Sequence, residues 1–304
     1  MKRNTLSACL GGVILLSAHL PASAIQIVFD YSFDTSGFFS SQLNRDVLQA
    51  AGNTLGNRLS DNLLAITPSG RNAFTANFNA PSSGTATSLN NYSVAENALV
   101  VFVGSQDLGG ALGLAGPGGF DASGSAGFLD LVATRGQAGA PDTDFGPWGG
   151  AISFDSTANW YFDSDLSTSD DINGSDFYTV ALHELGHVLG LGTSTSWNNL
   201  SVSGDFIGPT AGTVSLDASG GHFANRTLSE VDGVAQIAAM TPSVRNGTRK
   251  EFTDLDYAAL SDIGWQVTPV PVPAALWLFA SGLLGLFAVG RQRKQIVADG
   301  TQCQ

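Results

Sequence analysis

His183-Glu184-Leu185-Gly186-His187 is the stretch around which the rest of this 304-residue chain is organised. Two histidines four residues apart on a helix project from the same face, one turn above the other. Both imidazoles can then bind one Zn²⁺ at the usual distance of about 2.0–2.1 Å. Glu184 points slightly away from that face, so it can deprotonate a zinc-bound water instead of binding the metal. The stretch therefore predicts a catalytic zinc site with Glu184 as the general base.

The motif lies in a predicted helix over about residues 177–190. Apolar residues at helical spacing give this helix a buried face and turn the histidines toward a cleft. These residues are Tyr178, Leu182, Leu185 and Leu189. Gly190 follows His187 by three residues, and a glycine there allows a left-handed turn that ends the helix and directs the chain back toward the metal.

Strand-like and helix-like segments surround this helix and predict an α+β fold. Apolar runs predict strands at 25–31, 73–78, 98–103, 128–133 and 150–155. Apolar spacing predicts helices at 40–64, 228–239 and 251–263. The glycine-rich segment 104–127 is predicted to be a long surface loop over the site. It contains no phosphate-binding loop or dinucleotide fingerprint, which argues against those classes of nucleotide-binding protein.

A catalytic zinc of the three-histidine type needs one more imidazole. The chain has four histidines, and His19 lies in an N-terminal segment that is expected to be removed. His222 is then the candidate third ligand. Two alternatives remain open. His222 could be an unrelated surface histidine, or the third ligand could be acidic, with Asp217 or Glu230 as the candidates.

These residues resemble the extended motif H-E-x-x-H-x-x-G-x-x-H of the metzincin metalloproteases. The chain matches the motif through Gly190, but Thr193 stands where the third histidine belongs. A threonine hydroxyl is a poor zinc ligand. In the leishmanolysin-like branch an insertion separates the glycine from the third histidine, and that spacing fits His222.

The resemblance covers about residues 150–265 and implies a zincin fold. Such a fold is α+β, with a twisted mixed β-sheet, an active-site helix and a small C-terminal subdomain that supplies His222 and Met240. Met240 lies downstream of His222, just before Pro242. The family has a methionine at this point that forms a hydrophobic floor below the metal. The alternative is an ordinary core methionine.

The predicted function is that of an exported zinc endopeptidase acting on protein or peptide substrates through a water activated by Glu184. The residues predicted to form an edge strand that pairs with extended substrate are Ala151, Ile152, Ser153 and Phe154. The rival interpretation is a non-catalytic surface or extracellular-matrix protein that retains a metal site, and the altered motif position at Thr193 favours it.

An aspartate-rich segment precedes the active-site helix and carries oxygen ligands of the kind that Ca²⁺ prefers. Its candidate ligands are Asp171, Asn173 and Asp176. Their spacing does not match an EF-hand. The simpler interpretation, which we favour, is a solvated acidic loop in which Ser175 or Asp176 caps the next helix. Ca²⁺ is thus a second candidate cofactor beside Zn²⁺.

The N-terminus has the pattern of a secretory signal peptide over residues 1–24, with a basic start, an apolar run and Ala22-Ser23-Ala24 as the cleavage pattern.

The metalloprotease domain is expected to span residues 25–268. It contains 8 Lys and Arg against 25 Asp and Glu, a net charge of −17. Such an acidic domain argues against nucleic acid as a partner. Cys9 and Cys303 lie outside it, so it is expected to fold without disulfides.

Residues 269–294 combine a Pro-Val motif, an apolar stretch over 274–290 and a basic cluster, and a tail over 295–304 follows. The apolar stretch is long enough to cross a bilayer as a helix. The arrangement resembles a PEP-CTERM sorting signal, which implies a Gram-negative bacterium and a membrane-bound sorting protease as a partner. The protein is then expected at the cell surface, anchored in the membrane by this helix or released outside the cell.

Overall fold

The computed structural model describes residues 24–168 and 171–269. The described residues up to Gln266 belong to one compact unit, and residues 267–269 belong to a second. The predicted signal peptide, apart from Ala24, and the apolar stretch 274–290 lie outside the described residues. Within the described ranges, no helix has the length and apolar character needed to cross a membrane.

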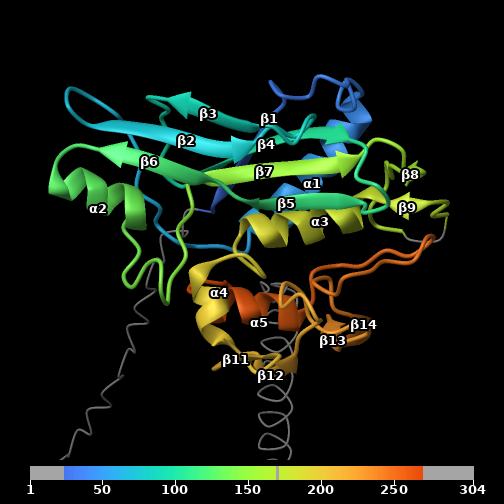
Figure 1. The fold of residues 1–304 in the computed structure, drawn as a ribbon. Helices are drawn as coiled ribbons and strands as arrows, with labels where there is room; N and C mark the ends of the chain where they lie inside the picture. Colours follow the sequence, from blue (N-terminus) through green and yellow to red (C-terminus); the bar gives the residue numbers. More distant parts are fainter. Residues whose placement is uncertain (1–23, 169–170, 270–304) are drawn as a thin grey trace, which may run out of the picture. The chain divides into compact units, whose positions relative to one another are not determined.

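A four-stranded mixed sheet forms the scaffold of the first unit (Figure 1). Its strands, in spatial order, are β1 (Gln26–Asp30), β4 (Ala98–Gln106), β7 (Gly149–Asp155) and β5 (Gly113–Pro117). The first three run parallel, and β5 pairs antiparallel with β7 at the edge. β4 is buried along almost its whole length, as its continuous apolar sequence predicted. The predicted α+β class with a mixed sheet is therefore confirmed.

The motif-bearing helix α3 (Phe177–Val188) packs against β5 and β7. Asp176 is its N-cap, because the carboxylate accepts a hydrogen bond from the backbone N–H of Thr179. Nearly every residue of α3 is buried, and His183 is the partly exposed one. The helix is thus held on all sides, which fixes the direction of its side chains.

A second long helix, α1 (Gln42–Gly56), packs against α3 and β1. Gly52 allows this close approach, because a β-carbon there would lie 2.9 Å from the Phe29 ring. α1 is shorter than the predicted helix over 40–64. The apolar residues Leu59 and Leu63 are buried, but they belong to the extended segment that follows the helix.

A second, antiparallel sheet and a short helix share a hydrophobic core with the main sheet. The elements are β3 (Ala86–Asn90), β2 (Ala73–Asn79), β6 (Gly119–Ser123) and α2 (Ala126–Thr134). Phe78 of β2 stacks on Phe102 of β4 in this core, with ring centroids 4.2 Å apart. The core explains why β4 is apolar on both of its faces.

Two predictions for this region are wrong. The segment 104–127 is not a long loop, since β5 and β6 form within it. Its glycines hide the strand pattern, because they contribute no side-chain alternation. The segment 128–133 is helical, because Ser125 caps α2 and only Phe128 and Val132, four residues apart, are buried.

The C-terminal part of the first unit is built from short elements. They are α4 (Thr195–Leu200), β10 (Ser201–Val202), β11 (Asp205–Gly208), β12 (Gly212–Ser215), β13 (Leu228–Val231), β14 (Val234–Ile237) and α5 (Asp254–Asp262). A further pair, β8 (Trp160–Tyr161) and β9 (Ser175–Asp176), lies just before α3. The predicted final helix over 251–263 corresponds to α5.

The predicted helix over 228–239 is wrong, because β13 and β14 form a hairpin there. Asp232 and Gly233 connect the two strands with φ angles of 51° and 77°. Positive φ at both central residues is what a type I′ hairpin turn requires, and Asp-Gly is a favoured pair for it. The dipeptide was therefore a better signal than the apolar spacing.

Candidate metal centre

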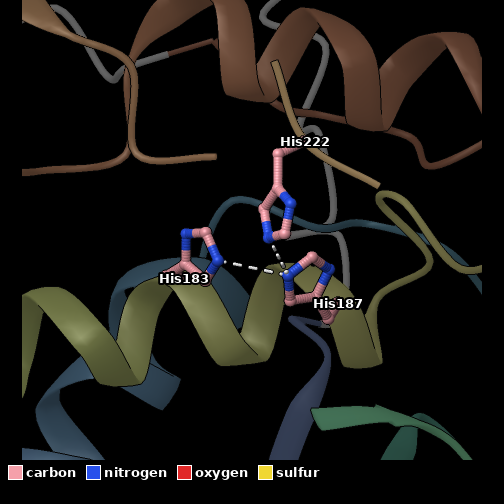
Figure 2. Close-up of side chains that lie close together, drawn as sticks. All are labelled: His183, His187 and His222. Atoms are coloured by element: carbon pink, nitrogen blue, oxygen red, sulfur yellow. Dashed lines mark hydrogen bonds between the residues drawn. The ribbon is translucent and has the colours of Figure 1, made fainter. Parts of the chain in front are cut away.

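Three histidine side chains from two separate parts of the chain converge (Figure 2). His183 and His187 lie on successive turns of α3, and His222 lies in the segment between β12 and β13. The Nε2 atom of His187 is 3.1 Å from Nε2 of His183 and 3.2 Å from Nε2 of His222. Tetrahedral zinc with Zn–N bonds of 2.0–2.1 Å separates its nitrogen ligands by about 3.3–3.4 Å. The spacing of the three rings therefore fits a single zinc ion.

The other ring nitrogen of each histidine has a hydrogen-bond acceptor. The Nδ1 acceptors are Ala239 O for His183 at 2.8 Å, Leu191 O for His187 at 2.8 Å, and the Asp217 carboxylate for His222 at 3.3 Å. Carbonyl and carboxylate oxygens only accept, so each neutral ring carries its proton on Nδ1. The three Nε2 lone pairs then face one another with no proton between them. This arrangement is repulsive without a cation, and it is the donor set that zinc takes up.

Burial keeps the two helix histidines neutral. Desolvation, followed by the charge of His187, lowers the pKa of His183 well below its usual range. Desolvation also lowers the pKa of His187 to about 4. Metal binding requires the neutral imidazole, so both rings are in the binding form near neutral pH.

His222 reaches the helix because the chain turns back directly after α3. Gly190 ends the helix with a φ of 103°, which confirms the predicted left-handed turn. Gly192 follows with a φ of 74°, and a β-carbon there would overlap the carbonyl oxygen of Gly221. The two backbones can therefore touch only because residue 192 is a glycine. Nothing in the sequence indicates this contact.

Thr193 caps the end of α3. Its hydroxyl donates a hydrogen bond to the backbone carbonyl of His187 at 2.7 Å. Thr193 also lines the cleft next to the three histidines. The departure from the extended motif at this position therefore has a local structural role, and His222 is the third histidine that the fold brings to the other two.

The acidic alternatives for the third ligand do not belong to the cluster that the three histidines form. Asp217 accepts hydrogen bonds from His222 and Ser219. These bonds and the charge of His222 outweigh the effect of burial and lower the pKa of Asp217. Glu230 lies exposed on β13. Across the described ranges, the cluster of His, Cys, Asp or Glu side chains close enough to share one metal consists of the three histidines. Asp217 orients His222 instead.

We expect Asp217→Ala to lower zinc affinity by about 10–100-fold, because the Nδ1–H of His222 loses its acceptor and the ring loses its fixed orientation. Competition of the purified chain with a chromophoric chelator measures this change. Asp130→Ala is the matched control, since Asp130 is an exposed aspartate on α2. Equal zinc affinity of both variants and the wild type would show that Asp217 does not support the ligand.

Met240 packs against the turn of α3 that carries the ligands. It is fully buried, and its Sδ atom would lie 2.5 Å from a β-carbon at Gly186, between the two helix histidines. The buried Asp256 carboxylate accepts the backbone N–H groups of Ala239 and Met240 at 2.9 and 3.0 Å. Because Ala239 O also binds His183, Asp256 helps to fix a ligand. The sequence analysis missed Asp256, although Thr253 and Asp256 show the spacing of a capping box.

Glu184 lies inside a cleft of about 500 Å³ that α3, β5 and the segment 239–244 line. Its side chain faces the edge strand, because a β-carbon at Gly113 would overlap the carboxyl group. Burial raises the pKa of Glu184 to about 8. A cation held by the histidines acts in the opposite direction and favours the carboxylate. A proton-accepting group is therefore placed between the metal ligands and an open strand edge.

The predicted substrate strand is wrong. Ala151, Ile152, Ser153 and Phe154 belong to β7, which is paired with β4 on one side and β5 on the other. No backbone edge is left there for a substrate. The exposed edge next to the cleft belongs to β5, and Gly113, Leu114 and Ala115 of this strand line the cleft.

The described residues do not support the candidate calcium site. Asp176 is completely buried, and both of its carboxylate oxygens accept hydrogen bonds from Arg249. Asp171 and Asn173 are exposed instead. The Asp176 carboxylate is therefore already bonded within the protein, and Asp176 acts as the helix cap that the simpler interpretation predicted.

The mixed sheet, the active-site helix and the three converging histidines have the arrangement of a metzincin-like zincin fold, and the three imidazoles form a donor set that suits zinc. Residues 129–203 match the family of peptidases described as Matrixin (Peptidase_M10). A stretch of 46 residues is 52% identical to Matrix metalloproteinase-2 of Drosophila melanogaster, which is 15% of this chain and 6% of that protein. No solved structure matches the chain. These matches support a metzincin-type metalloprotease, and the family match ends at residue 203, before His222.

Proposed function

We propose that this chain is an exported zinc-dependent endopeptidase. The observation that carries the proposal is the convergence of three Nε2 lone pairs beside the buried Glu184 carboxyl, next to the open edge of β5. The matrixin match over the helix that bears His183 and His187 supports the same activity. The chain spans only a small part of the relative it matches, so the activity of the whole protein is part of the proposal.

The residues divide the catalytic work between them. His183, His187 and His222 would hold a zinc ion, which would supply a Lewis acid for the substrate carbonyl and for water. Glu184 accepts the proton of the attacking water and passes it to the leaving amine. The free backbone edge of β5 binds the substrate as an added strand and so orients the peptide bond.

The proposal includes the segments at both ends of the chain. A signal peptide over residues 1–24 precedes the metalloprotease domain over 25–268, and a sorting segment over 269–294 attaches the protein to the membrane until a sorting protease removes it. The sequence patterns of these segments support export. Mass spectrometry of the protein recovered from its host would give both mature ends.

Removal of the metal tests the proposed activity. We expect the zinc-loaded chain to cleave casein or a mixed peptide library, to lose this activity on chelation and to regain it with one equivalent of Zn²⁺. The reason is that burial keeps His183 and His187 neutral and that the three histidines already converge. A chain that binds zinc but is inert on all of these substrates would be a surface or matrix protein with a retained metal site.

A further inference from the structure

Lys250 is a buried charge in the cleft that the proposed mechanism does not use. It is 4% exposed. Among the described residues that line the cleft, Lys250 is the one basic residue of the Lys or Arg type. Glu184 is the one Asp or Glu. The ammonium group therefore determines the charge of the part of the cleft around it.

Hydrogen bonds fix Lys250 between α3 and the facing wall of the cleft. Its backbone N–H donates to the hydroxyl of Thr179 at 2.8 Å. Its Nζ donates to the hydroxyl of Thr241 at 2.8 Å and to the carbonyl of Ser243 at 2.7 Å. The side chain thus crosses from the helix to the segment that follows Met240, and its position is set before any substrate binds.

Within the described part of the chain, the hydrogen-bond partners of the Lys250 ammonium leave one N–H donor and the positive charge without a partner. An ammonium group has three N–H donors, and the two acceptors are both neutral. Desolvation has the larger effect on the pKa of Lys250 and lowers it. Among the described residues, Asp256 acts in the opposite direction, through its charge and not through a hydrogen bond. A buried cation without a bonded anion is costly. An incoming carboxylate would supply both the missing charge and the missing acceptor.

Lys250 lies close to the place where the substrate bond would be cleaved. Thr179 and Val180 lie on α3 one turn before His183, and they line the same cleft. The wall that faces α3 connects the two groups, because Ala239 accepts the hydrogen bond of His183 and Thr241, two residues later, accepts that of the Lys250 ammonium. A substrate side chain next to the scissile bond can therefore reach the ammonium.

We propose that Lys250 selects substrates with Asp or Glu next to the scissile bond, an inference that rests on the proposed peptidase function. The net charge of the chain narrows the expected class of substrate further. The chain carries a net charge of −13, so at long range it attracts basic peptides and repels acidic ones. The expected substrate is a neutral or basic segment with a single acidic residue at the cleavage site.

Cleavage-site profiling tests this selectivity. The zinc-loaded full chain is given a mixed peptide library, and mass spectrometry reads the residues on both sides of each cut. Paired peptides with Glu or Gln at the enriched position then give the ratio of their kcat/KM values. We expect a ratio of at least about tenfold in the wild type. We expect about one in Lys250→Met and a retained preference in Lys250→Arg. Arg245→Met is the matched control, since it removes an exposed charge from the same segment.

Binding of the same two peptides to zinc-loaded Glu184→Gln provides a second readout that needs no hydrolysis. Cleavage by the wild type with a Glu to Gln ratio near one would overturn the role of Lys250 and leave the peptidase function intact. The same holds if Lys250→Met folds and keeps the wild-type ratio, which would make Lys250 only a clamp on the cleft wall. If the wild type neither cleaves nor binds either peptide, both proposals fail.

Discussion

Glu184→Gln is expected to keep its zinc and to lose peptide hydrolysis by about 10²–10⁴-fold in kcat/KM. Glutamine has nearly the same size as glutamate, so it fits beside Gly113, where the carboxyl group now lies. It cannot accept a proton from water, however, and the step that forms the attacking nucleophile loses its base. Zinc is retained because the metal cluster consists of the three histidines.

The measurement combines peptide cleavage with the zinc content of the same sample. Glu230→Gln is the matched control, because Glu230 is exposed on β13 and does not line the cleft. This control should behave as the wild type does. An active Glu184→Gln variant would remove Glu184 from the mechanism. An inactive variant without zinc would instead mean that Glu184 supports the metal.

Gly192→Ala is expected to weaken zinc binding by at least about tenfold, although residue 192 binds no metal. An alanine at a φ of 74° is strained. Its β-carbon would also overlap the carbonyl oxygen of Gly221, so the segment that carries His222 has to move. The third ligand would then be displaced from the other two.

Gly212→Ala separates these two causes. Gly212 has nearly the same φ, 73°, but a β-carbon there meets nothing within 4 Å. This control should show the loss of stability that comes from backbone strain and keep its affinity for zinc. Equal zinc affinity of the two variants in a chelator competition would show that the contact between Gly192 and Gly221 does not position His222.

The sequence was sufficient for the features that depend on local spacing. His183, Glu184 and His187 are set by the period of a helix, and the helix itself is indicated by its buried stripe and by Gly190. β4 could be predicted because a continuous apolar run signals a strand buried on both faces. His222 could be chosen because histidine is scarce in the chain.

Features that depend on distant partners could not be predicted. The edge strand β5 has the sequence Gly-Leu-Ala-Gly-Pro, which carries no alternation, and only its pairing with β7 makes it a strand. Asp256 and Lys250 are ordinary polar residues in the sequence. Their roles follow from contacts with Ala239 and Thr241, which tertiary packing brings to them.

The contact between Gly192 and Gly221 belongs to the same group, since nothing in either local sequence relates one glycine to the other. The altered position at Thr193 was visible, but its meaning was not. Its bond to the carbonyl of His187 shows that the hydroxyl satisfies a backbone acceptor at the C-terminal end of the helix. The helical spacing in the sequence therefore locates His183 and His187. The fold brings His222 to them from a distant segment.

Zinc titration of the metal-free full chain tests most directly whether a distant histidine completes this centre. The account predicts one zinc per chain for the wild type and for Thr193→Val, and a loss of affinity of more than about 100-fold for His222→Ala. His222→Ala with the zinc affinity of the wild type would contradict the account.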